Sequence, residues 1–396
     1  MMNRRQFLRR LSAAGGLLAL GPLAACVRPP EPAPEAAATP PPAATPTDAP
    51  EPATASPTPT EAPARAAPTA TPPPTEAPDA APTATAAATA APSPMPEEVQ
   101  MAQVALIKTT DRAEGVRRAV ALLGVNPVQG RSVFLKPNFN SADPAPGSTH
   151  PDVLRALVGQ LREMGADEIT LADRSGMGNT RNVMQRLGVF EQADELGYDA
   201  IVLDELESED WTLIETPDDH WSQGFPVPRM MLDAGALVNA CCLKTHRFGG
   251  HFTLALKNSV GYVAKRIGAG HDYMGELHGS AHMRTMIAEI NAARLPDLIV
   301  LDGVTAFTHG GPDRGTIADT EVMLAGTDPV AMDAIGVAIL RLFGTTDEVS
   351  RGAVFEQEQI ARAAEMGLGV AGPEQIELLT EDADGEAMAA EIMALL

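Results

Sequence analysis

The chain has 396 residues, of which 52 are acidic and 29 are basic, and its net charge is −23. A surface this acidic argues against nucleic acid or an anionic bilayer face as the ligand, because both carry negative charge. Three cysteines without a Cys-x-x-Cys spacing argue against an iron–sulfur cluster ligated by the protein.

The first 26 residues predict export from the cytoplasm. A short charged segment that contains Arg4 and Arg5 precedes an apolar run too short to span a bilayer, and small residues follow up to Cys26. The pattern resembles the signal of bacterial twin-arginine lipoproteins, which are carried by the twin-arginine export machinery. The resemblance implies that Cys26 receives a lipid and anchors the protein at the outer face of a bacterial membrane. An ordinary cleaved signal with an incidental cysteine is the alternative.

Residues 27–98 predict a disordered linker between the lipid and a folded domain. This stretch consists almost wholly of Pro, Ala, Thr, Ser and Glu, and it contains no aromatic residue. Such a composition buries too little apolar surface to offset the entropy of ordering the chain. A proline-rich ligand for a partner protein is the alternative.

Residues 99–396 predict an α/β domain, whose length also allows two closely packed lobes. Apolar runs with strand composition lie at 104–108, 132–136, 168–173, 200–204, 236–244, 297–302 and 321–325. Helical patterns lie between several of them, notably at 112–123, 152–164, 282–293 and 329–343. This alternation predicts a mostly parallel sheet with helices on both faces, in which ligands bind at the carboxyl ends of the strands.

Polar side chains occur where four of the predicted strands end. They are Lys136, Asn138, Asp173, Lys244, His246 and Asp302, and Gly311 follows the last of these strands in a Gly-Gly-Pro turn. Each residue alone is explained by a strand that reaches solvent. Together they predict a polar cleft at one edge of the sheet.

Lysine is rare in this chain, which has 24 arginines and five lysines. Lys136, Lys244 and Lys257 all lie in apolar or glycine-rich surroundings. Lysine offers a compact charge and a pKa that burial can shift. We therefore predict that these lysines enclose a small anionic ligand, a carboxylate or a phosphate. A purely structural network with Asp173 and Asp302 is the alternative.

Five of the eight histidines fall between residues 246 and 282. If one helix carried both His278 and His282, the two rings would share a face, as metal sites often require. These residues, with His246 and His309, are the candidate ligands of a divalent metal. Histidines that only donate and accept hydrogen bonds are the alternative.

The order of these motifs resembles the DUF362 family over nearly all of residues 102–380. The motifs are Lys136-Pro137-Asn138, Lys244-Thr245-His246, Leu256-Lys257-Asn258, Asp302-Gly303, Gly311-Pro312 and Asp328-Pro329 with Asp333. The family is named for its unknown function, so the resemblance supports the fold more than an activity. Some members carry ferredoxin-like cysteine clusters, and this chain lacks those cysteines.

These observations predict an extracytoplasmic, lipid-tethered α/β protein whose polar cleft handles a small anionic ligand, as an enzyme with metal assistance. In this hypothesis His246 exchanges a proton or binds metal, Lys244 acts beside it, and Asp302 holds the imidazole or the metal. The predicted ligand-binding residues are Lys136, Asn138, Asp173, Lys257, Asn258 and Gly311. A non-catalytic lipoprotein that binds a solute or cofactor for a membrane partner is the alternative.

Overall fold

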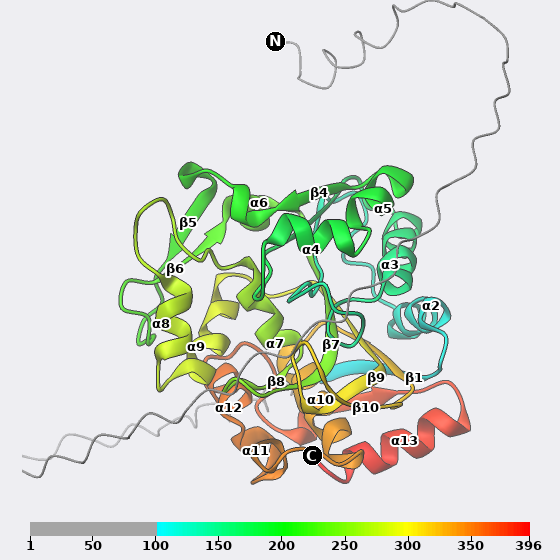
Figure 1. Ribbon diagram of the computed structural model, residues 1–396. Coiled ribbons are helices and arrows are strands. Elements are labelled where there is room, and N and C mark those ends of the chain that lie inside the picture. Colours follow the sequence, from blue (N-terminus) through cyan, green and yellow to red (C-terminus); the bar gives the residue numbers. More distant parts are fainter. Residues whose placement is uncertain (1–100) are drawn as a thin grey trace, which may run out of the picture. The chain divides into compact units, whose positions relative to one another are not determined.

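A computed structural model describes residues 101–396 (Figure 1). The predicted signal, Cys26 and the predicted linker lie outside the described residues. The strands of the described part are β1 (Ala102–Lys108), β2 (Val133–Lys136), β3 (Ile169–Asp173), β4 (Asp199–Val202), β5 (Trp211–Ile214), β6 (Phe225–Pro228), β7 (Ala236–His246), β8 (His251–Thr253), β9 (Leu298–Gly310), β10 (Gly315–Ala318), β11 (Val322–Gly326) and β12 (Ile376–Leu379).

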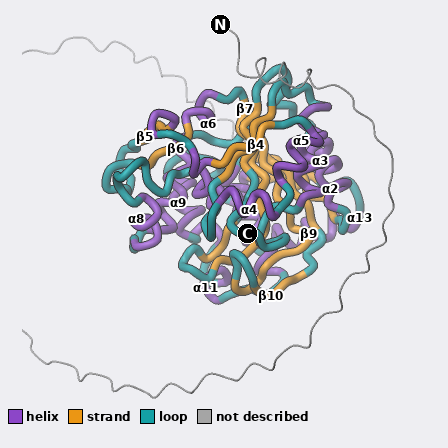
Figure 2. The backbone as a smooth tube through the Cα atoms, turned by 45° about the horizontal axis from the view of Figure 1, so that its top comes forward, coloured by secondary structure: helices purple, strands orange, loops and turns teal. Residues whose placement is uncertain are grey.

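The α-helices of the same residues surround these strands (Figure 2). They are α2 (Arg112–Leu123), α3 (Pro151–Glu163), α4 (Thr180–Arg186), α5 (Val189–Leu196), α6 (Arg229–Asp233), α7 (Ala255–Asn258), α8 (Tyr273–Gly279), α9 (Met283–Ile290), α10 (Pro329–Leu342), α11 (Asp347–Ser350), α12 (Glu358–Glu365) and α13 (Ala383–Met393). Among residues 101–396, no helix combines the length and apolar character that a membrane crossing requires.

Ten strands form one sheet in the order β12-β1-β11-β9-β7-β2-β3-β4, with β8 beside β7 and β10 beside β9. The five neighbouring strands from β9 to β4 are all parallel to one another. On the other side of β9, strand β11 pairs antiparallel with both β9 and β1. The predicted α/β fold with a mostly parallel sheet is therefore confirmed.

The apolar core lies on both faces of this sheet. Along β1, Ala105 and Ile107 join the core cluster that contains residues of α2 and α3. Val104 and Leu106 join the opposite cluster, which contains residues of α10, α12 and α13. Successive side chains of a strand point to opposite faces, so a strand that is apolar throughout is typical of a sheet covered on both sides.

The chain changes direction across the sheet between β2 and β7. From β2 it continues outward to β3 and β4, and from β7 it later continues the other way to β9. In open α/β sheets, ligands bind at the carboxyl ends of the strands where the order reverses in this manner. The carboxyl end of β2 carries Lys136, and that of β7 carries Lys244 and His246.

Strands β7 and β9 are longer than the sequence pattern predicts. They continue past residues 244 and 302, and each pairs there with a short antiparallel strand, β8 or β10. The extended end of β7, strand β8 and the turn after β9 contribute His246, Thr253 and Pro312, respectively, to the site described next.

Candidate functional site

A small polar cavity, called the inner cavity below, lies at the carboxyl ends of β2, β3 and β7, and its volume is about 50 Å³. Seven of the residues predicted for the site line it: Lys136, Asn138, Asp173, Lys244, His246, Lys257 and Asn258. Lys136 Nζ, for example, donates a hydrogen bond to Asn258 Oδ1, which lies 122 residues later in the sequence. The fold therefore brings together most of the polar strand ends that the sequence singles out.

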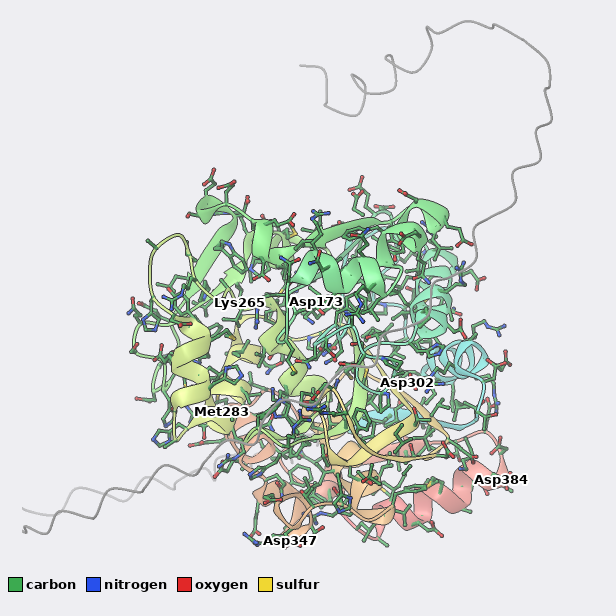
Figure 3. All side chains as sticks on the ribbon, in the orientation of Figure 1. Asp173, Lys265, Met283, Asp302, Asp347 and Asp384 are labelled. Carbon is green, nitrogen blue, oxygen red and sulfur yellow. The ribbon has the colours of Figure 1, made fainter. Side chains whose placement is uncertain are left out.

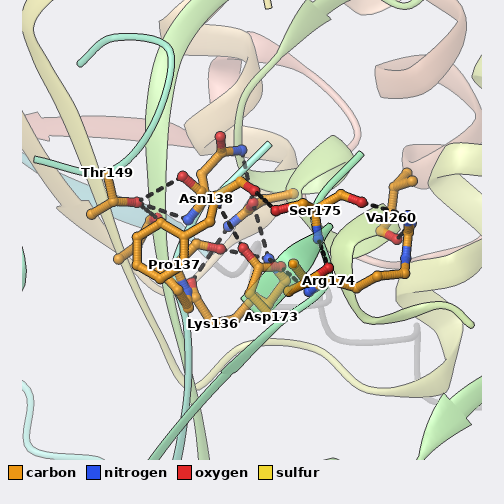
Figure 4. A network of polar contacts seen from close by, with 12 residues as sticks. Lys136, Pro137, Asn138, Thr149, Asp173, Arg174, Ser175 and Val260 are labelled. Atoms are coloured by element: carbon orange, nitrogen blue, oxygen red, sulfur yellow. Dashed lines mark hydrogen bonds and ion pairs between the residues drawn. The ribbon is translucent and has the colours of Figure 1, made fainter. Parts of the chain in front are cut away.

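Lys136 and Asp173 form a buried ion pair on neighbouring strands (Figure 4). The Lys136 Nζ lies 2.7 Å from Asp173 Oδ1, and the carboxylate also accepts the backbone N–H groups of Phe139 and Arg174, each at 2.7 Å. Burial lowers the pKa of Lys136 and raises that of Asp173, and their mutual attraction opposes both shifts. A Cβ at Gly261 would lie 2.6 Å from Lys136 Nζ and from Asp173 Oδ1, so this position requires glycine.

Lys244 is held by neutral oxygens instead of a carboxylate. Its Nζ donates to Asn138 Oδ1 at 2.9 Å and to the Gly147 carbonyl at 2.6 Å. The Asn138 amide donates in turn to Asn258 Oδ1 at 2.9 Å, and Asn258 donates to Asn239 Oδ1 at 2.6 Å. Burial lowers the pKa of Lys244. These hydrogen-bonded asparagine side chains orient the ammonium group of Lys244, but they are neutral and supply no negative charge to balance it.

The side-chain amine of Lys257, on α7, has neither a hydrogen bond nor an ion pair within the described residues. The side chain is 8% exposed and lines the inner cavity. Burial lowers the pKa of Lys257 to about 7, and the positive charges of Lys244 and Arg174 act in the same direction. A large fraction of this amine is therefore uncharged near neutral pH.

His246 is buried beside these lysines, and its Nδ1 has no hydrogen-bond partner among the described residues. Burial lowers the pKa of His246 well below 6.5, and the charges of Lys257 and Lys244 lower it further. The ring contacts Phe248 edge-on, with centroids 5.9 Å apart. This imidazole is neutral at neutral pH and has one ring nitrogen free to exchange a proton.

Arg174 also lines the inner cavity, although the sequence analysis did not select it. Its buried guanidinium donates to the carbonyl oxygens of Val263 at 2.7 Å and Val260 at 2.6 Å (Figure 4). The residue follows directly after Asp173 at a strand end, and that position is the signal that could have identified it. The argument from rare lysines does not apply to an arginine.

A larger cavity of about 490 Å³, called the outer mouth, adjoins the inner cavity. Seven residues line both: Asn140, Arg174, Gly176, His246, Lys257, Val260 and Pro312. The outer mouth adds apolar atoms of Phe248 and Met274, and Lys265 and His278 also line it. Lys257 and His246 thus stand where the two cavities meet.

Asp302 and Gly311 do not line the inner cavity, which corrects two predicted assignments. Asp302 accepts a hydrogen bond from Arg112 Nε at 2.8 Å, and Figure 3 shows it well apart from Asp173. It therefore pairs with an arginine of α2 and does not hold His246. The Gly311 carbonyl accepts from Arg247, while the next residue, Pro312, is the one that lines both cavities.

The four candidate metal ligands do not form a common site. His246 and His278 both line the outer mouth, but His282 stacks on His220 with ring centroids 4.4 Å apart, and His309 pairs with β10. Helix α8 ends at Gly279 and α9 begins at Met283, so no single helix carries His278 and His282. Within residues 101–396, no group of three or more His, Cys, Asp or Glu is arranged to hold a metal ion.

Asp333, on α10, positions the helix that carries Lys257. Its Oδ1 accepts the backbone N–H groups of Ala255 at 2.7 Å and Leu256 at 3.1 Å, the first residues of α7. Burial raises the pKa of Asp333 to about 8. The sequence analysis noted Asp333 in a DUF362 motif, but its partners lie 77 and 78 residues away and only the fold shows them.

Comparisons with known proteins match the part of the chain that builds the site. A family model described as "Domain of unknown function (DUF362)" matches residues 133–338, which is 206 of the 396 residues. The "Thylakoid-associated protein sll1697" of Synechocystis sp. is 27% identical over 223 residues, which cover 54% of this chain and 64% of that protein. The chain therefore spans less than two thirds of the length of that relative. No solved structure matches.

Proposed function

The chain belongs to the DUF362 family, a domain of unknown function, and we propose that it binds a small anion in the inner cavity. One observation carries the proposal: the lining holds four basic side chains and a single carboxylate. The basic residues are Lys136, Arg174, Lys244 and Lys257, and the carboxylate is Asp173. This excess of positive charge occurs inside a protein whose net charge is −23.

The physical argument concerns buried charges that lack a partner. A buried charge is costly unless it is paired and hydrogen-bonded. Within residues 101–396, Asp173 pairs with Lys136, whereas the amine of Lys244 has only neutral acceptors and that of Lys257 has none. A bound anion would supply the missing counter-charge for both lysines.

The size of the inner cavity supports an anionic group of a few atoms. A cavity needs about 10–15 Å³ of space open to a water-sized sphere to hold one water molecule, and the inner cavity has about 50 Å³ by the same measure. A carboxylate or a similar small group matches this space. The remainder of an organic ligand would then extend into the outer mouth of about 490 Å³.

Anion binding is tested on the purified full-length protein by thermal unfolding and calorimetry with inorganic phosphate and with acetate. We expect at least one of these anions to raise the Tm of the wild type in a concentration-dependent manner. Lys257→Gln should weaken this effect, and Lys108→Gln should retain it. Lys108 is a matched control because it pairs with Glu321 and does not line the inner cavity.

Failure to bind either anion, or an equal response from both variants, would refute an anion site at Lys257. If an anion binds tightly and is not chemically converted, the solute- or cofactor-binding alternative is favoured over an enzyme.

The second part of the proposal is that the protein is exported by the twin-arginine route and tethered to a membrane by lipid on Cys26. The support is the N-terminal sequence pattern, together with a relative whose name describes it as thylakoid-associated. Cys26→Ala should release the protein from washed membranes. The double variant Arg4→Lys, Arg5→Lys should keep the protein in the cytoplasm. If Cys26→Ala remains on the membrane, the tether is not this lipid.

A further inference from the structure

We propose that Lys257 forms an imine with the carbonyl group of a small 2-oxo acid whose carboxylate occupies the inner cavity. This inference rests on the proposed anion site and adds the chemical class of its ligand. It also gives Lys257 a catalytic role that charge neutralisation alone does not require.

The first argument is that Lys257 is the lysine of the cavity whose amine is unoccupied. Lys136 Nζ is engaged by Asp173 at 2.7 Å, and Lys244 Nζ donates to Asn138 and Gly147. Lys257 Nζ has no hydrogen bond or ion pair in the described part of the chain. Within the described residues, Lys257 is the one of the three whose amine is not held in place by an acceptor, so it can turn toward a carbonyl carbon.

The second argument is the electrostatic surroundings of that amine. Only an uncharged amine attacks a carbonyl carbon, and lysines are activated in this way by desolvation and neighbouring cations. Lys257 is buried, and Lys244 and Arg174 are the cations that lower its pKa, to about 7. The same cations would hold the carboxylate of the ligand, so activation and binding come from one set of residues.

The third argument is the place of Lys257 between the two cavities. The inner cavity is large enough for a carboxylate, and Lys257 lines both it and the outer mouth. In a 2-oxo acid the carbonyl carbon is bonded directly to the carboxylate. A carboxylate in the inner cavity therefore places this carbon at the boundary, beside Lys257, and directs the remaining atoms toward Phe248 and Met274 in the outer mouth.

The reaction balances without any additional oxidant or reductant. The lone pair of Lys257 Nζ forms a bond to the carbonyl carbon as the carbon–oxygen π bond breaks, and the oxygen takes one of the two amine protons from nitrogen. The resulting carbinolamine loses this hydroxyl with a proton from nitrogen as one water molecule, which leaves a carbon–nitrogen double bond.

His246 is placed to carry the proton between nitrogen and oxygen. A Cβ on Gly250 would lie 2.6 Å from Lys257 Cε and 2.9 Å from His246 Nδ1, so the two side chains approach one point. The imidazole is neutral, and this Nδ1 has no other partner in residues 101–396.

The test is reductive trapping on the purified full-length protein with pyruvate and sodium borohydride. Borohydride converts the imine into a stable secondary amine, and mass spectrometry of the peptides identifies the modified residue. We expect one modified lysine per chain, Lys257, and we expect it only when both pyruvate and borohydride are present. Lactate, which has the carboxylate but no carbonyl group, should give no label. Because mapping uses the wild type, the test does not depend on the folding of a variant.

A label on Lys265 of the outer mouth, or one spread over several lysines, would overturn the proposal. Lys257→Arg keeps a positive charge without a comparable nucleophile, so it should bind pyruvate without being labelled at that position. If calorimetry shows that pyruvate and lactate bind but no label forms, the anion site stands and the imine does not. If neither binds while phosphate does, the imine fails and the anion site stands. If no anion binds, both proposals fail.

Discussion

The variant Lys257→Met should change how the stability of this protein depends on pH. The pKa of Lys257 is lowered from 10.5 to about 7 by burial, with Lys244 and Arg174 contributing. Between these two pH values the unfolded chain holds a proton that the folded chain has lost. The free energy of unfolding of the wild type therefore rises with pH, by about 1.4 kcal/mol per pH unit from this group. Below pH 7 both states are charged, and the full cost of burying the ammonium group applies.

Methionine is unbranched, of similar length and not ionisable, so the variant lacks this slope. We expect its stability relative to the wild type to be greatest below pH 7 and to decline by about 2–3 kcal/mol between pH 7 and pH 9. The other titratable groups that line a cavity with Lys257 are retained in both proteins: Lys136, Asp173, Arg174, Lys244, His246, Lys265 and His278. His246 stays neutral over this range because its pKa lies well below 6.5.

The assay is urea unfolding of the two full-length proteins at pH 7, 8 and 9, in a buffer free of phosphate and carboxylates. Lys108→Met serves as the control, since Lys108 forms its ion pair with Glu321 away from the cavity. If the stability difference between Lys257→Met and the wild type is the same at pH 7 and pH 9, Lys257 does not lose its proton on folding. In that case the reasoning from burial and neighbouring charge is wrong.

Three further variants test the supports of the site. Asp333→Leu removes the acceptor for two backbone N–H groups of α7 and should destabilise the protein by about 2–4 kcal/mol in urea unfolding, while Asp333→Asn should restore most of that loss. Gly261→Ala forces a Cβ to within 2.6 Å of Lys136 Nζ and Asp173 Oδ1, so calorimetry should show anion binding lost; unchanged affinity would contradict the tight packing. Lys136→Met leaves the buried Asp173 carboxylate without its counter-charge and should cost about 3–5 kcal/mol; adding Asp173→Asn, which removes the charge and keeps an oxygen acceptor for a backbone N–H, should recover part of it in thermal unfolding.

Several features of this protein follow from the sequence alone because they depend on local patterns. Apolar runs with strand composition identified β2, β3 and β7, and the alternation with helices identified the fold class. The helical pattern predicted at 329–343 corresponds to α10, and Asp328 caps that helix by accepting the N–H groups of Val330 and Ala331. Strand ends and rare lysines selected most of the polar lining, since parallel strands end at one edge of a sheet.

Only the tertiary structure decided which of these side chains are partners. Asp302 lies on β9 where the sequence pattern predicts a strand to end. Its side chain pairs with Arg112, 190 residues away, and does not line the inner cavity. His282 and His309 lie outside the two cavities although they are near the other histidines in sequence. Asp333 supports α7 from a different helix, and the amine of Lys257 has no partner in the part of the chain that the structure describes. Such contacts depend on strand register and on the packing of distant elements, which local sequence patterns do not encode.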